Sequence, residues 1–247
     1  MHRERRLISA VTVTGSSMLA LGLCLTACDL VGGTSFSDDA AVSGTVSSVR
    51  IDNEAGSVTV RGAAGTKNVS VHRTIRYRGD KPGGKSYEVS DGELTLRGCG
   101  SKCAVSYTVT VPTGMPVNGA NTAGTVHLSD VGAVDVTTSS GGVQMERVHG
   151  AVRVTTSDGA ITGTGLAAPR IDTRTSNGTI DLAATVQPDV TAKADNGAIT
   201  LTVPNKRYRV STTTSTGSRQ ISVATDPNAD HRLDLKTSNG AITVKTA

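Results

Sequence analysis

Residues 79–86 match the phosphate-binding loop pattern G-x-x-x-x-G-K-[ST] letter for letter, as Gly-Asp-Lys-Pro-Gly-Gly-Lys-Ser. In a nucleotide-binding protein this loop opens a helix, whose N-terminal amides and dipole hold the phosphate groups. Residues 87–96 instead alternate polar and apolar side chains and then turn, which predicts strands. The sequence therefore predicts a Gly- and Pro-rich turn at this place, and no nucleotide or other cofactor.

The four cysteines offer a second kind of chemistry. Cys24 and Cys28 lie in the N-terminal segment discussed below, which leaves Cys99 and Cys103 as the pair in the part expected to fold. They bracket Gly-Ser-Lys between two strand-like segments, and in an exported protein such a pair most simply forms a disulfide. A metal site needs more ligands, and a redox pair usually has two intervening residues rather than three. We predict a structural disulfide and no metal site.

Groups that could catalyse a reaction are few and separated. No G-x-S-x-G nucleophile elbow accompanies any of the four isolated histidines, which are His72, His127, His149 and His231. A glycan-cleaving β-helix would need clustered carboxylates, and the nearest candidates, Asp172 and Asp181, fall at different positions of the repeat. We therefore predict no catalytic residues and no enzyme. A glycan-processing β-helix is the least supported alternative.

A repeat with a period near 20 residues organises the chain from residue 124 onward. The pattern is a glycine followed by apolar, polar and apolar residues, and its clearest copies start at Gly159, Gly178, Gly197 and Gly240. Three weaker copies start at Gly124, Gly141 and Gly217, which makes seven in all. Seven to nine residues before each central apolar residue lies a second alternating segment, such as Val152 and Val154. Each repeat is thus predicted to be two short strands, and stacked repeats of this length indicate a solenoid.

Short polar corners join the two strands of a repeat. Asn-Gly and Asp-Gly tolerate positive φ, and nearby hydroxyl or carboxylate groups can bond backbone amides, as a tight bend requires. The turn-forming residues predicted for these corners are Asp158, Gly159, Asn177, Gly178, Asn196, Gly197, Asn239 and Gly240.

An antiparallel hairpin is the main rival to a parallel coil, because Asn-Gly often joins hairpin strands. In a coil, equivalent positions of successive repeats would stack about 4.8 Å apart. The column Asp135, Arg153 and Asp172 alternates in sign, which suits such stacking. We therefore favour the parallel coil.

The N-terminus has the order of a bacterial lipoprotein signal. A charged start at residues 2–6 precedes a largely apolar span at 7–23, and residues 25–28 read Leu-Thr-Ala-Cys, the form of a lipobox. We expect residues 1–27 to be removed and Cys28 to carry lipid; an uncleaved membrane helix and an ordinary secretory signal are the alternatives. Arg5-Arg6 leaves the export route open between the general secretory and twin-arginine pathways. The expected location is the outer side of the cell membrane.

The remaining chain divides into a tether and one folded domain. Residues 28–45 are small, polar and without periodicity, which predicts a flexible tether. Alternation then begins, so 46–247 is the predicted domain, with 46–111 an irregular cap that includes some antiparallel pairing and 112–247 the regular coils.

The net charge of the mature chain is predicted to be close to neutral. The net charge is +4, and loss of residues 1–27 removes three Arg and one Glu, which leaves +2. A basic column at Arg174, Lys193 and Lys236 lacks a nucleic-acid motif or stacking aromatics, so it indicates a solvated face and no nucleic acid. We expect a monomer whose final coil, residues 233–244, ends the stack and resists strand addition through its charges.

With the lipobox, the Gly-x-Ile-x-Leu copies, the Thr-Ser-Asn-Gly corners and the Cys99 and Cys103 pair in view, residues 46–247 resemble the putative adhesin family of bacterial β-strand-repeat proteins. This family of unknown function is related to the GIN head domain of auto-transporter adhesins. The resemblance implies an all-β, right-handed parallel β-solenoid, that is, a single-stranded β-helix. It implies no catalytic residues. We expect a lipid-anchored, non-enzymatic binding, adhesion or structural protein with an unknown protein or surface partner; a regulatory partner of a membrane sensor is the alternative.

Overall fold

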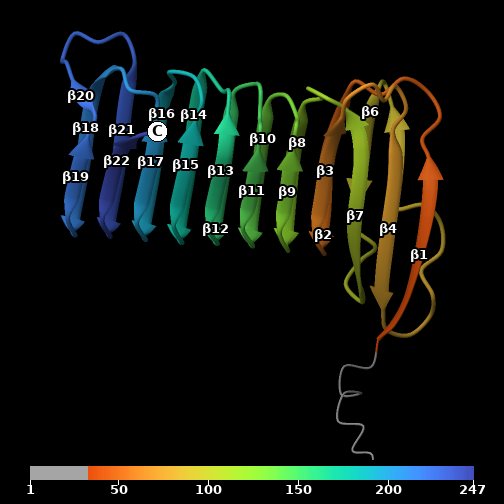
Figure 1. The fold of residues 1–247 in the computed structure, drawn as a ribbon. Coiled ribbons are helices and arrows are strands. Elements are labelled where there is room, and N and C mark those ends of the chain that lie inside the picture. The colour runs from red at the N-terminus through yellow and green to blue at the C-terminus, as the bar shows by residue number, and fades with distance from the viewer. Residues whose placement is uncertain (1–32) are drawn as a thin grey trace, which may run out of the picture. The chain divides into compact units, whose positions relative to one another are not determined.

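The computed structural model describes residues 33–247, and all its regular structure is β. Its 22 strands form two sheets of 11 strands each, called sheet A and sheet B. The two sheets face each other, and each coil contributes a strand to both, so that the coils form a row (Figure 1). In spatial order, sheet A contains β1 (Thr34–Ala41), β4 (Ser70–Tyr77), β7 (Cys103–Pro112), β3 (Val58–Ala63), β9 (Val126–Ser129), β11 (Val143–Glu146), β13 (Ile161–Leu166), β15 (Ile180–Ala184), β17 (Ile199–Val203), β22 (Ile242–Thr246) and β19 (Arg219–Ser222). In the opposite direction along the row, sheet B contains β20 (Ala224–Thr225), β18 (Arg207–Thr216), β21 (Arg232–Asn239), β16 (Asp189–Asn196), β14 (Arg170–Asn177), β12 (Val152–Asp158), β10 (Val134–Ser140), β8 (Val117–Ala123), β2 (Ser48–Ala55), β6 (Glu93–Arg97) and β5 (Tyr87–Ser90).

Strand pairing confirms the parallel coil over the hairpin. Equivalent residues of successive repeats are partners, as in Asp135 with Arg153 and Arg153 with Asp172 on sheet B. On sheet A the central apolar residues of two successive repeats, Ile161 and Ile180, pair in the same way. Antiparallel pairing occurs within residues 33–247 only in β1–β4, β4–β7 and β5–β6.

The core is a continuous file of inward side chains between the two sheets. The alternating residues expected to point inward are buried, for example Val152, Val154 and Ile161, all at most 2 % exposed. Nearly all are Val, Ile, Leu, Ala or Thr, because the two sheets of one coil leave little space between them. Each coil therefore buries its apolar side chains against its neighbours along the row.

Glycine is needed at the corners chiefly because the corners stack in contact. A Cβ built on Gly178 would collide with the carbonyl oxygen of Gly159, and one on Gly197 with that of Gly178. Gly178 and Gly197 also have φ of 159° and 151°, which L side chains rarely adopt. Buried threonines complete the corner: the hydroxyl of Thr175 donates to the Gly159 carbonyl at 3.0 Å. A side chain at these positions would force the coils apart.

The coils do not follow one another in chain order. The C-terminal pair β21 and β22 lies between the coil of β16 and β17 and the coil of β18 and β19. At the other end, β2 and β3 lie between the coil of β6 and β7 and the coil of β8 and β9. The expectation that residues 233–244 end the stack is therefore wrong, because another coil covers them on each side and residues 207–222 form the last coil.

The prediction of a flexible tether at 28–45 is wrong for residues 34–41. They form β1, which pairs antiparallel with β4 over its whole length. Phe36 packs edge-to-face on Tyr77 with 6.0 Å between ring centroids, and Asp38 forms an ion pair with Arg73. These tertiary contacts give order to a segment whose own sequence has no strand signal.

The export signal and Cys28 lie outside the described residues. Within residues 33–247 no helix is long and apolar enough to cross a membrane.

Candidate functional site

The predicted corner residues form a ladder of side-chain hydrogen bonds. The amide of Asn177 donates to the Asp158 carboxylate at 2.8 Å, that of Asn196 to Asn177 at 3.0 Å, and that of Asn239 to Asn196 at 2.9 Å. Because the β21 coil follows the β16 coil in space, Asn239 continues the ladder directly after Asn196. The ladder ties neighbouring corners together and has a structural role.

The predicted Cys99–Cys103 disulfide is present, with 5.7 Å between the two Cα atoms. It closes the link between β6 and β7, near the end of the row that contains β1. Neither cysteine is available as a metal ligand or a free nucleophile.

The other candidate chemical groups stay apart. Asp172 lies on sheet B beside Arg153, whereas Asp181 lies on sheet A, so the two carboxylates do not form a pair. His127 faces outward from β9 and its Nε2 lies 3.8 Å from Glu146. In the part of the chain that the structure describes, no group of three or more His, Cys, Asp and Glu could hold a metal ion.

The phosphate-loop match lies in the irregular link between β4 and β5, and a strand follows it, as predicted. Its Gly84 and Ser86 bind protein groups: the Gly84 carbonyl and the Ser86 hydroxyl both accept hydrogen bonds from Arg73. The segment therefore helps to close the end of the row.

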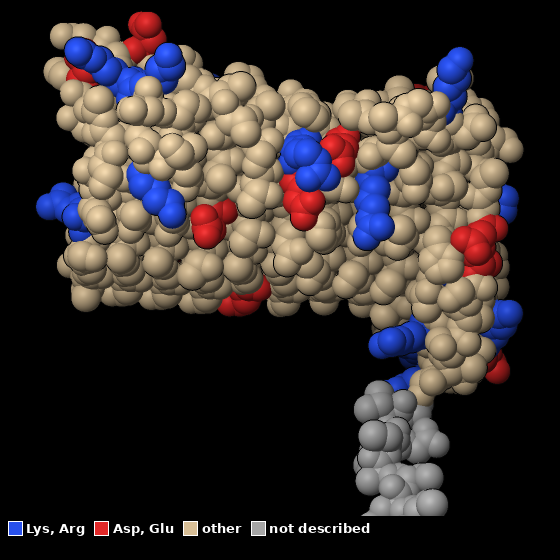
Figure 2. All heavy atoms as spheres, in the orientation of Figure 1, with Lys and Arg blue, Asp and Glu red and all other residues tan. Residues whose placement is uncertain are grey.

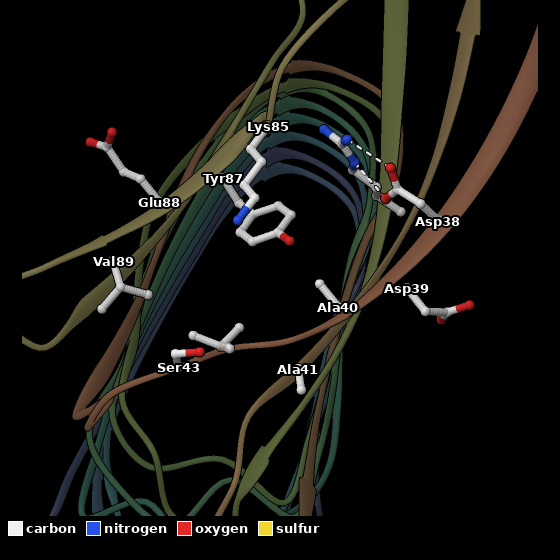
Figure 3. A pocket seen from close by; sticks show the side chains of 11 residues that line it. Asp38, Asp39, Ala40, Ala41, Ser43, Lys85, Tyr87, Glu88 and Val89 are labelled. Atoms are coloured by element: carbon white, nitrogen blue, oxygen red, sulfur yellow. Dashed lines mark hydrogen bonds and ion pairs between the residues drawn. The ribbon is translucent and has the colours of Figure 1, made fainter.

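A pocket of about 520 Å³ opens at this end, between the edge strands β1 and β5. Ala40, Val42 and Val89 give it an apolar part. Lys85 and Tyr87 approach from the β5 side and Asp38 from the β1 side (Figure 3). The pocket is the mouth of the space between the two sheets.

A nearly buried arginine forms the inner wall of this pocket. The Arg73 side chain is 7 % exposed, and its Nε and Nη2 donate to the two Asp38 oxygens at 2.7 Å each. Its guanidinium also lies 5.7 Å from the centroid of the Tyr87 ring. The hydrogen bonds to Asp38 raise the pKa of Arg73, and those from Arg73 lower the pKa of Asp38. Both groups therefore stay charged at neutral pH, so they serve to hold β1 and do not transfer protons.

Tyr107 completes this network from β7. Its hydroxyl lies 2.6 Å from both the Ser86 carbonyl and the Arg97 carbonyl. Burial raises the pKa of Tyr107 to about 12, so it stays protonated at neutral pH. Sequence reasoning did not single out Arg73, Asp38 or Tyr107. An arginine at an inward position of an alternating strand, between Val71 and Ile75, is the signal that could have found the network.

The outward faces carry side chains in register. On sheet B the column Arg174, Lys193 and Lys236 places three cations at neighbouring positions. The adjacent column alternates in sign, and Arg153 Nε lies 4.0 Å from Asp135. In the view of Figure 2, charged side chains stand singly or in small groups along the row and gather at its ends. The faces are flat arrays of side chains held at the strand spacing.

Comparison with known proteins gives the following similarities. The chain resembles a putative adhesin from Parabacteroides distasonis (14 % identity, TM-score 0.48, covering 87 % of this chain and 98 % of that one). It also resembles a putative adhesin from Bacteroides fragilis (16 % identity, TM-score 0.47, covering 87 % of this chain and 97 % of that one). A third similar structure is that of a putative cell adhesion protein from Clostridium sporogenes (13 % identity, TM-score 0.39, covering 87 % of this chain and 100 % of that one).

No curated protein matches the sequence at a significant level. A relation to the GIN head domain stays a prediction. The family model described as Toastrack DUF4097 matches residues 45–245. Because this match spans most of the sequence, the chain belongs to the Toastrack DUF4097 family.

Proposed function

We propose that this protein is a non-enzymatic, adhesion-like binding protein of the cell envelope. Its flat sheet B face would bind an anionic envelope component. The row of coils acts as a rigid scaffold in this proposal, and the coil is taken to be right-handed, as the family resemblance predicts.

The basic column of Arg174, Lys193 and Lys236 carries the proposal. Strand register places these cations at successive positions about 4.8 Å apart, where like charges repel. None of them belongs to an ion pair formed within residues 33–247. Neighbouring columns reduce such repulsion with alternating charges or with Thr and Ser, as in Asp135, Arg153 and Asp172. An arrangement that costs stability when unbound would gain it from a bound anion.

A binding assay on isolated envelopes tests this function. Replacing Arg174, Lys193 and Lys236 together by Gln should weaken binding of the purified full chain at least about tenfold, and should reduce its dependence on salt. Lys67, Arg78 and Lys102 provide the matched control, since they are exposed, carry the same charge and lie in loops or a turn near the other end. Equal binding by the two triple variants would contradict the proposal.

The membrane anchor is a separate part of the proposal and rests on the lipobox at residues 25–28. Cys28→Ala should move the protein from the membrane pellet to the soluble fraction with its thermal unfolding unchanged, because two acyl chains anchor far more firmly than one. A variant that stays wholly in the pellet would contradict lipid anchoring. Crosslinking on intact cells would then identify the partner, and recovery of a membrane sensor would favour the regulatory alternative.

A further inference from the structure

The end of the row opposite the pocket has an unpaired strand edge. β18 pairs with β21 through residues 209–216, but on its other side β20 covers only Arg207 and Tyr208. The carbonyls of Tyr208 and Thr212 face this open side, because they accept from the Asp226 amide at 2.9 Å and from Arg219 at 3.4 Å. Since backbone groups alternate along a strand, the N–H groups of Val210, Thr212 and Thr214 face the same side.

The interior next to this edge is only partly covered. Val210, Ile221 and Val223 pack on the core but stay half-buried. In the neighbouring coil of β21 and β22, the partners of Val210 and Ile221 are Leu233 and Val244, and both are 0 % exposed. Residues 210–218 are Val-Ser-Thr-Thr-Thr-Ser-Thr-Gly-Ser, with no charge and no proline. A β-branched, uncharged edge of this kind is suited to pair with another strand.

Cations surround the open edge. Lys206, Arg207, Arg209 and Arg219 lie on or beside its strands, and the only ion pair that they form within the described chain joins Arg207 to Asp226 at 3.5 Å. Lys and Arg side chains gather at this end of the row in Figure 2. The Arg219 guanidinium donates a hydrogen bond to the Thr212 carbonyl, which an added strand would need as an acceptor. Two copies that met through this edge would bring these cations together.

We propose that the β18 edge is an acceptor site for an extended segment of a partner protein that carries acidic residues. About seven residues, roughly 23 Å of strand, would pair with residues 210–216. A carboxylate of the incoming segment forms an ion pair with Arg219 and replaces its hydrogen bond to the Thr212 carbonyl. That carbonyl can then accept a hydrogen bond from the new strand. The inference does not depend on the basic column of sheet B, which lies on the outer face and not at the edge.

Two labelled peptides test the acceptor site on the purified full chain. Each has a core of alternating Val and Thr, flanked on both sides by two Glu or by two Lys. We expect the Glu peptide to bind at least about tenfold more tightly than the Lys peptide. Arg209→Gln combined with Arg219→Gln should bring the two affinities within about twofold. Arg61→Gln combined with Arg76→Gln should keep the preference, because these exposed arginines lie on β3 and β4.

Thr212→Pro tests pairing through the backbone. It removes an N–H that faces the open side, a position where an edge strand tolerates proline. We expect the Glu peptide to bind at least about tenfold more weakly, with the circular dichroism spectrum unchanged. If this variant does not fold, the arginine pair decides. Absence of saturable binding, a charge preference that survives Arg209→Gln with Arg219→Gln, or light scattering that shows the unmodified chain paired through this edge would overturn the proposal.

Discussion

At the β1 end of the row, antiparallel strands and the ion pair of Arg73 with Asp38 cover the inward side chains. Val71, Ile75 and Val105 there are at most 2 % exposed. At the β18 end the inward Val210 and Ile221 stay half-buried, and the exposed Arg219 donates a hydrogen bond to the edge carbonyl of Thr212. Both ends finish the same kind of coil. The difference shows that a parallel stack can end either by changing strand direction or by keeping its edge and placing charge on it.

The corner glycines give the largest expected effect and test whether the β18 end is free to shift. Gly178→Ala places a methyl group against the Gly159 carbonyl in the middle of the row, at a φ of 159°. We expect a loss of about 3 kcal/mol in the free energy of unfolding, from backbone strain and overpacking. Gly217→Ala makes the same contact with Gly240 but in the last coil, which can move outward, so its cost should be clearly smaller.

Urea unfolding of both variants measures this difference. Gly65→Ala is the control, because its φ of 75° is unfavourable for alanine while nothing lies within 4 Å of the added Cβ. Equal losses for Gly178→Ala and Gly217→Ala would mean that the last coil is held as firmly as the interior.

Arg73→Gln should open the β1 end. The substitution leaves the Asp38 carboxylate and the Gly84 carbonyl without the Arg73 donors. Because the Asp38 side chain is 42 % exposed, water replaces part of this interaction, and we expect a loss of about 2 kcal/mol in the free energy of unfolding. Hydrogen exchange should rise in residues 34–41 and stay unchanged at the β18 end. Asp39→Asn is the control, since the one ion pair that Asp39 forms within residues 33–247 joins it to the partly exposed His72. Unchanged exchange in β1 would show that the ion pair does not hold this strand.

Much of the repeat was predictable because its pattern is local. The central apolar residues, the other inward residues and the corners follow from a period near 20 residues. The disulfide was predictable because Cys99 and Cys103 bracket a short loop. The order of the coils could not be predicted, since every coil offers its neighbour the same strand edges and the same glycine corner. Residues 232–246 therefore fit beside β16 as well as residues 207–222 would.

The contacts that close the β1 end were also beyond sequence reasoning. Residues 34–41 read Thr-Ser-Phe-Ser-Asp-Asp-Ala-Ala, without alternating apolar residues. Their strand depends on pairing with β4 and on Arg73, 35 residues away from Asp38. A long-range partner of this kind leaves no periodic signal.

Replacing Cys99 and Cys103 by Ser should lower stability by about 2 kcal/mol, because closing so short a loop removes little entropy from the unfolded chain. The loss should be greatest in strands β6 and β7 and should not reach the β18 end. Free-thiol labelling of the denatured, unreduced protein checks the pairing first, and two reactive thiols would contradict it. Calorimetry of the double variant then gives the stability change.

Acid should weaken the β1 end before the β18 end. Arg73 lowers the pKa of Asp38 below its ordinary 3.8, so this pair adds stability above that pH and loses it as pH falls through the folded-state pKa. The effect should be smaller than that of the disulfide, since the Asp38 side chain is 42 % exposed. Hydrogen exchange of residues 34–41 below pH 4 measures it. Asp38→Asn should remove the pH dependence of this segment, and an unchanged dependence would assign it to other carboxylates.

Arg219→Gln should have the smallest effect on stability and completes the comparison, because it makes the same substitution at the opposite end. Arg219 is exposed and its hydrogen bond to the Thr212 carbonyl is 3.4 Å long, so we expect a loss below about 0.5 kcal/mol. Its consequence should appear in association: with Thr212 exposed, light scattering at high protein concentration should detect more self-association than in the unmodified chain, and more than in Arg61→Gln. A loss comparable to that of Arg73→Gln would instead make Arg219 a structural cap. The two ends would then both be closed, and strand addition at β18 would have to break a stable contact first.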